Sequence, residues 1–184
     1  MQNSLCSTVH GLALATAAIV ATALAHAATA EAFVDVGAHA TRVEADIVGM
    51  PHTFTDTSGL HFGAGLRREL RQGSIGARLE LDDVDGDLLL AVRALDYRRH
   101  ISDRWALTAF AGAARLDVAT PAYGYYFGGG VELKELWPRW SLGVDVRRGD
   151  KLARDNVLPT DPQGSGDDNF YDLTGVAVYM RRRF

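Results

Sequence analysis

Apolar and polar residues alternate along most of the chain after residue 31. Between residues 75 and 82, for example, Ile75, Ala77, Leu79 and Leu81 alternate with glycine and ionisable residues. A period of two is that of a β-strand, whose successive side chains point to opposite faces. The alternation recurs in eight stretches, at residues 34–41, 60–67, 75–82, 88–94, 107–114, 125–133, 141–147 and 176–180. The pattern predicts an all-β chain of eight antiparallel strands.

The second face of these strands is unusually rich in glycine and in charges of both signs. Nine residues carry its ionisable groups: Asp35, His39, Arg67, Arg78, Glu80, Arg93, Glu132, Asp145 and Arg147. Hydrocarbon offers no hydrogen-bond partners, so a sheet that crosses a bilayer must close on itself with its apolar face toward lipid. We therefore predict an eight-stranded antiparallel up-and-down transmembrane β-barrel over residues 31–184. A soluble barrel with an apolar interior is the competing fold.

In the predicted barrel the nine residues form an ionic network in the lumen. Buried charges need partners of opposite sign. We expect the four arginines to pair, in some combination, with four carboxylates, namely Asp35, Glu80, Glu132 and Asp145. The glycines suit a crowded lumen and strongly curved strands. An eight-stranded barrel is just wide enough for side chains to fill it, so no wide channel is expected.

The connections between the strands alternate in character. Tight polar turns are predicted near residues 71–74, 98–104 and 134–139, and longer or more acidic loops at 44–59, 83–87, 117–122 and 148–169. Short turns on one rim and long loops on the other are typical of outer-membrane barrels. The short-turn rim should gather arginines, namely Arg98, Arg99, Arg104, Arg139, Arg181, Arg182 and Arg183. Aromatic residues fall near both rims, where membrane interfaces favour them.

The first thirty residues differ from the rest of the chain. They contain no Asp, Glu, Lys or Arg, and an apolar run from Leu12 to Leu24 precedes two A-x-A sequences. The run is too short to span a bilayer as a helix. We interpret residues 1–30 as a signal peptide cleaved after Ala27 or Ala30, although the usual basic residues at its start are missing. The single cysteine, Cys6, lies within it.

In its N-terminal segment and its alternating strands, the chain resembles the small eight-stranded outer-membrane proteins, the OmpA-like or porin-like barrel family. The resemblance spans residues 32–184 and includes the stretch 101–112 and the terminal Phe184. It implies a bacterial outer-membrane location, contact with outer-membrane lipids and lipopolysaccharide, and recognition by the barrel-assembly machinery. Members commonly end in an aromatic residue with apolar residues at alternate positions before it, so Phe184, Met180 and Val178 are the implied assembly signal. Arg182 departs from that pattern.

Candidate chemistry is sparse. Residues 141–147 resemble the penultimate strand of lipid A deacylases, but the catalytic His-x-Ser that should follow is replaced by Arg147-Arg148-Gly149. The chain's His-x-Ser, at 100–102, falls in a turn on the other rim. The acidic stretch 83–87 fits a hairpin turn on Asp85-Gly86 better than a calcium loop. We predict no catalytic residue, no metal and no cofactor, and the mild net charge of −4 indicates no nucleic-acid binding.

Three functions remain open on these grounds. The leading hypothesis is a non-enzymatic outer-membrane barrel with a structural, adhesive or narrow-pore role. The second is a surface binding module that contacts an extracellular ligand through loops 44–59 and 148–169. The third is a lipid A-modifying enzyme of the deacylase type, for which the catalytic pair is missing.

Overall fold

The structure is a computed structural model that describes residues 30–47, 50–118, 121–154 and 170–184. The predicted signal peptide, apart from Ala30, lies outside the described residues, and so does the stretch 155–169 of the longest predicted loop. Within the described residues, no helix is long and apolar enough to cross a bilayer.

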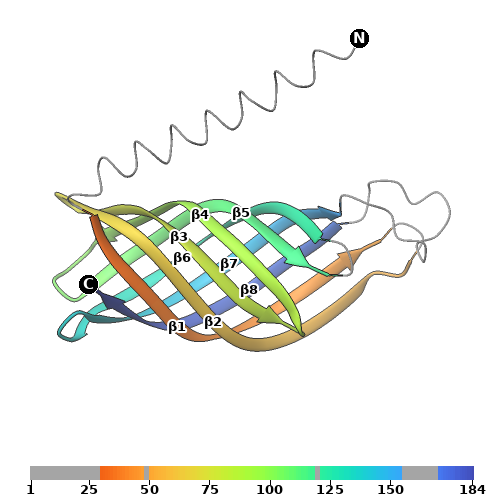
Figure 1. Cartoon of the computed structure of the whole chain (residues 1–184), viewed down its shortest axis with the longest axis horizontal. Coiled ribbons are helices and arrows are strands. Elements are labelled where there is room, and N and C mark those ends of the chain that lie inside the picture. The colour runs from red at the N-terminus through yellow and green to blue at the C-terminus, as the bar shows by residue number, and fades with distance from the viewer. Residues whose placement is uncertain (1–29, 48–49, 119–120, 155–169) are drawn as a thin grey trace, which may run out of the picture. The chain divides into compact units, whose positions relative to one another are not determined.

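Eight antiparallel strands form a closed barrel in sequence order (Figure 1). The strands are β1 (Ala30–Asp46), β2 (Thr53–Leu70), β3 (Gly73–Val84), β4 (Asp87–His100), β5 (Trp105–Asp117), β6 (Pro121–Trp137), β7 (Trp140–Arg154) and β8 (Phe170–Arg183). Pairing of β1 with β8, which places Ala38 opposite Val178, closes the sheet and leaves no free edge. The predicted eight-stranded antiparallel barrel is therefore confirmed.

The apolar face of the strands lies on the outside of the barrel. Leu79, Val178 and Val146 are 45%, 45% and 57% exposed, whereas the alternate residues Arg78 and Asp145 are 2% and 0% exposed. A soluble barrel would have the opposite arrangement. An outer surface of this kind is suited to acyl chains, and the buried polar face is the lumen.

Both ends of the described barrel, near Ala30 and Phe184, lie at the same end of the cylinder as the β2–β3, β4–β5 and β6–β7 turns (Figure 1). We call this the periplasmic end and the opposite one the outer end. The turn between β6 and β7 contains only residues 138–139, where the sequence predicted 134–139, because β6 continues through a register shift to a Trp137–Trp140 pair.

The outer loops are shorter than predicted because the strands continue past the apolar band. Residues 44–46 and 53–59 belong to β1 and β2, and 148–154 belong to β7. In β7 this extension pairs with β6, with Ala153 opposite Tyr123. In β7 a register shift between Gly149 and Leu152 interrupts the period-two pattern, while the hydrogen-bonded ladder continues past it.

The β3–β4 connection is the two-residue hairpin expected at Asp85-Gly86. The two residues have φ values of 57° and 85°, the left-handed conformation that a type I′ turn requires. The Gly86 N–H donates to Asp83 Oδ1 at 3.0 Å, and the Asp85 N–H donates to Thr57 Oγ1 of β2 at 3.1 Å. In the acidic stretch 83–87, the Asp83 carboxylate and the backbone of Asp85 and Gly86 thus form the turn.

Candidate functional site in the barrel lumen

The lumen holds a charge-balanced set of buried ionic side chains. All nine residues of the predicted network point into it, and each is at most 4% exposed. The structure adds Asp82, Asp96, Arg98 and Arg181, together with His61. Among the described residues the buried charges then amount to six arginines and six carboxylates. Equal numbers allow every charge a partner, as burial in a low dielectric demands.

Arg93 and Arg78 occupy the middle of the lumen. The Arg93 guanidinium lies 2.6 Å from Glu80 and 2.7 Å from Asp145. Arg78 lies 2.9 Å from Asp35 and 3.0 Å from Glu80. Strands β1, β3, β4 and β7, which are distant in sequence, are thus joined across the barrel axis.

Hydroxyl groups complete this middle layer around the same carboxylates. Thr108 Oγ1 and Tyr179 Oη donate to Asp145 at 3.0 and 3.1 Å, and Tyr126 Oη donates to Glu80 at 2.9 Å. These bonds satisfy lone pairs that a single arginine would leave open.

A second ionic layer lies toward the periplasmic end. Arg98 is 2.7 Å from Glu132, and Arg181 is 2.7 Å from Asp35 and 3.0 Å from Glu132. Arg98 and Arg181 therefore lie on the periplasmic side, as predicted, but inside the lumen and not on its exposed rim. Arg181 shares the inward phase of Tyr179, so alternation already contained the signal. Arg98 does not, because a bulge between Arg93 and Leu95 shifts the phase of β4.

A third layer lies above the middle one, toward the outer end. His61 Nδ1 is 2.5 Å from Asp82 Oδ1, and Arg147 Nη1 is 2.5 Å from Asp82 Oδ2. The expected partners for Arg147 did not include Asp82, so that part of the pairing prediction is wrong. Arg67 likewise pairs with Asp96 at 3.1 Å in the periplasmic layer, in addition to Glu132 at 3.6 Å. Asp82 and Asp96 are the partners that the sequence analysis missed.

Glycines make room for these side chains on neighbouring strands. Arg78 lies opposite Gly65, Arg93 opposite Gly112, and Arg147 opposite both Gly128 and Gly175. A Cβ at Gly63 would lie 2.8 Å from Arg78 Nε, and one at Gly130 would lie 2.5 Å from Asp145 Oδ1. Large ionic side chains and glycines therefore alternate around the lumen. The lumen between the strands is therefore occupied by these side chains.

The outer part of the lumen is apolar. A cluster of buried residues fills it below the outer loops: Val84, Leu89, Ala91, Phe110, Ala114, Leu116, Ala122, Tyr126, Leu152 and Leu173. Phe110 and Tyr126 mark its boundary, because the Arg93 guanidinium lies 3.4 Å from the centre of the Phe110 ring and the Tyr126 hydroxyl reaches Glu80. The cluster closes the outer mouth of the barrel over the charges.

The C-terminal residues lie on the outer surface at the periplasmic end. Val178 and Phe184 are 45% and 60% exposed, and Met180 is half-buried. Arg182, which departs from the expected terminal pattern, is stacked between two aromatic rings, at 5.7 Å from Trp140 and 5.2 Å from Phe184. The guanidinium thus contributes to an aromatic surface at a position where an apolar residue is usual.

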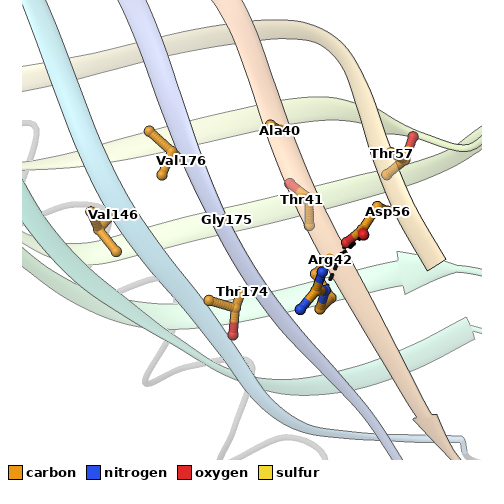
Figure 2. A pocket seen from close by; sticks show the side chains of 9 residues that line it. All are labelled: Ala40, Thr41, Arg42, Asp56, Thr57, Val146, Thr174, Gly175 and Val176. Carbon is orange, nitrogen blue, oxygen red and sulfur yellow. Dashed lines mark hydrogen bonds and ion pairs between the residues drawn. The ribbon is translucent and has the colours of Figure 1, made fainter. Parts of the chain in front are cut away.

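A shallow hollow on the outer surface lies where β7, β8, β1 and β2 leave the apolar band (Figure 2). Val146, Val176 and Ala40 line the side of the hollow nearer the periplasmic end, and Arg42 lies on the side nearer the outer end. Figure 2 shows Arg42 bound to Asp56, with distances of 2.7 and 2.9 Å for its two hydrogen bonds. This exposed pair lowers the pKa of Asp56, through the hydrogen bond first.

The His-x-Ser sequence at 100–102 forms no nucleophile–base pair in the described structure. The Ser102 hydroxyl accepts a hydrogen bond from the Trp105 N–H at 3.1 Å. The His100 ring lies 3.2 Å from Arg98 and 3.8 Å from Glu69. Both residues are at the periplasmic end, away from the outer leaflet.

Comparison with solved structures identifies the same architecture. Ail, the attachment invasion locus protein of Yersinia pestis, matches with a TM-score of 0.51 at 12% identity, over 84% of this chain and 98% of Ail. Ail in complex with the heparin analogue sucrose octasulfate gives 0.53 and 12%, over 84% and 99%. Neisserial surface protein A gives 0.51 and 12%, over 83% and 97%. No family model and no curated protein sequence matches the chain.

These matches establish a fold. The chain is built as a small eight-stranded barrel of the bacterial outer-membrane type.

Proposed function

We propose that the chain is a non-enzymatic outer-membrane protein whose sealed barrel is a rigid support for its outer strands and loops. The observation that carries this proposal is the filled lumen. Charged side chains that are at most 4% exposed occupy three layers of it, and an apolar cluster closes its outer mouth. A barrel with this interior supports a structural or adhesive role and does not favour the narrow-pore alternative.

Single-channel recording in planar bilayers tests the sealed lumen. The refolded protein should give no steady openings, and a wide-channel porin serves as the positive control. Removing the boundary rings in a Phe110→Ala, Tyr126→Ala variant should raise the frequency of small openings, because it thins the apolar closure. A Leu79→Ala variant, altered only on the outer face, is the matched control. Large, stable openings of the unmodified protein would contradict the proposal.

We further propose that residues 1–30 act as a signal peptide for export and that the C-terminal residues Val178, Met180 and Phe184 serve the assembly machinery. Their apolar or aromatic side chains lie on the outward face of the C-terminal stretch, where an assembly factor has access to them. Membrane fractionation with a heat-modifiability gel tests both proposals. A Phe184→Ala variant should accumulate unfolded in the periplasm, whereas a Phe54→Ala variant at the outer end should assemble normally.

Surface binding is the second candidate function, and the extended outer strands favour it. β1, β2 and β7 continue as paired strands past the apolar band, so they hold the outer loops away from the membrane. Ail has been solved with a polyanionic heparin analogue. The outer end of this chain instead carries many carboxylates, including Asp83, Asp85, Asp87 and four aspartates between 155 and 169. We propose that its ligand is neutral or cationic.

Deleting residues 155–169 tests this second function. Cells displaying the deletion variant should lose adhesion while the barrel remains heat-modifiable. A heparin column at physiological salt should not retain the unmodified protein, because like charges repel. Adhesion that survives the deletion, or firm retention on heparin, would count against the proposed surface.

A further inference from the structure

The periplasmic end of the barrel carries a basic hollow that the lumen network does not use. It lies between the β2–β3 turn, the β4–β5 turn and the end of β6, and its cations are Arg71, Arg99 and Lys134. Among the described residues that line the hollow, Asp103 is the single carboxylate. The hollow is distinct from the lumen, whose cations are buried.

The three cations differ from the lumen arginines in having no partner. Within the described part of the chain, the side chains of Arg71, Arg99 and Lys134 form no hydrogen bond or ion pair. Every lumen arginine, by contrast, lies within 3.1 Å of a carboxylate oxygen. Three cations and one carboxylate, Asp103, line the hollow, and Glu69, 3.8 Å from the wall residue His100, is already paired with Arg98. The hollow is therefore an electropositive site open to an anion.

His100 lies on the wall of the hollow, close to these positive charges. Its pKa is lowered by burial first, and then by the positive charges of Arg98 and Lys134. Glu69 and Glu132 act in the opposite direction but do not reverse the shift. His100 therefore adds no positive charge at physiological pH, and the positive charge of the hollow comes from Arg71, Arg99 and Lys134.

The position of the hollow identifies the kind of anion. Trp105, 48% exposed on the outer surface, begins β5 directly after the turn that lines the hollow, and Tyr97 lies two residues before Arg99. Such rings mark the depth at which lipid headgroups meet hydrocarbon. Arg99 is exposed and follows Tyr97 on the same face of β4, so it emerges at headgroup level. The Arg fork suits a phosphate group, and Lys134 adds a point charge.

We propose that this hollow binds the phosphate of an anionic phospholipid in the periplasmic leaflet of the membrane. The bound headgroup would anchor the turns of β2–β3 and β4–β5 to the membrane surface. The inference rests on the proposed membrane placement of the barrel.

Native mass spectrometry of the full chain, refolded in mild detergent, tests the proposal. Phosphatidylglycerol and phosphatidylcholine with identical acyl chains are added at equal concentration. The unmodified protein should retain phosphatidylglycerol preferentially. An Arg71→Gln, Arg99→Gln variant should lose about fivefold in that preference for each cation removed, which converts about 1 kcal/mol per basic residue near an anionic surface. The matched control, Arg42→Gln with Arg148→Gln, removes two cations at the outer end and should keep the preference.

Three outcomes would overturn the proposal: equal retention of the two lipids, an unchanged preference in the Arg71→Gln, Arg99→Gln variant, or displacement of the lipid by millimolar inorganic phosphate. The last would assign the hollow to a free ion. A heat-modifiability gel on each sample shows whether the barrel has folded. A sample that lacks the folded band would count against the membrane barrel itself, so the two failures are distinguishable.

Discussion

Two regions of the lumen are filled by opposite kinds of side chain. Arginines and carboxylates interlock in three layers from the periplasmic end upward, whereas leucines, alanines and aromatic rings pack together below the outer loops. Phe110 and Tyr126 join the two regions, since each contacts the apolar cluster with its ring and the ionic network with its π-face or hydroxyl.

The two kinds of side chain depend on their neighbours to different degrees. An apolar side chain contributes through its own buried area, so its loss leaves a local cavity. A buried ion is stable only while its partners remain, because the low dielectric that strengthens the pair also makes an unpaired charge costly. The apolar cluster keeps water from the charges, and so helps to maintain that low dielectric.

Removing one cation from the ionic half should have the largest effect. Arg93→Met leaves Glu80 and Asp145 without their shared partner and should reduce the free energy of unfolding by about 3–5 kcal/mol. Urea unfolding in micelles, followed by heat-modifiability gels, measures it. Arg68→Met, an exposed change on β2, is the control. A loss in Arg93→Met no greater than in the control would show that the charges do not act as a unit.

A second substitution that restores the charge balance should reverse part of this loss. Adding Glu80→Gln to Arg93→Met should recover a large part of the lost stability, since five arginines and five carboxylates then remain in the lumen and Asp145 still lies 3.6 Å from Arg78. Unfolding midpoints of the single and double variants, compared at one pH, provide the measurement. Additive losses in the double variant would contradict the expectation.

Truncating a residue of the apolar half should produce a loss that no second change recovers. Leu116 is 1% exposed, and Leu116→Ala should cost about 2–5 kcal/mol through lost burial and the cavity that remains. Leu79→Ala, on the lipid-facing surface, should cost less because lipid or detergent fills the space. Equal losses at the two sites would show that the outer cluster is loosely packed.

Overfilling the lumen should have an intermediate effect. Gly130→Ala brings a methyl group against Asp145 Oδ1 and the Val144 carbonyl and should destabilise the barrel by about 1–3 kcal/mol. Gly86→Asn, in the open β3–β4 turn with its positive φ, is the tolerated control. The same unfolding assay compares them, and a neutral Gly130→Ala would indicate spare room beside the charges.

Breaking an ion pair on the outer surface should have the smallest effect. Arg42→Gln removes the partner of Asp56, but both groups are solvated, so unfolding at physiological salt should be unchanged within error. The carboxyl pKa of Asp56, followed by NMR titration, should rise toward its ordinary value because the hydrogen bond that lowers it is gone. A substantial loss of stability would mean that exposed pairs matter here as much as lumen pairs.

The period of two predicted most of this architecture, including the identity of the lumen face. The prediction failed where a bulge or register shift interrupts the alternation along a strand. The bulge after Arg93 places Ala94 and Leu95 both outward and turns Asp96 and Arg98 inward, which strict alternation excludes. The strand end 148–154 also lost the signal, because a register shift between Gly149 and Leu152 interrupts the alternation before Leu152 enters the apolar cluster. Arg181 and Asp82 were in phase with the lumen all along.

The amino-acid sequence alone therefore determined the number of strands, their alternating faces and the need for a closed sheet, because those follow from local periodicity and from the cost of bare backbone in lipid. The pairing of each arginine with its carboxylate, and the level at which the lumen changes from ionic to apolar, are seen only in the folded barrel. Those features depend on strand register, bulges and distances across the barrel axis, and they join residues more than a hundred positions apart, as Asp35 and Arg181 show.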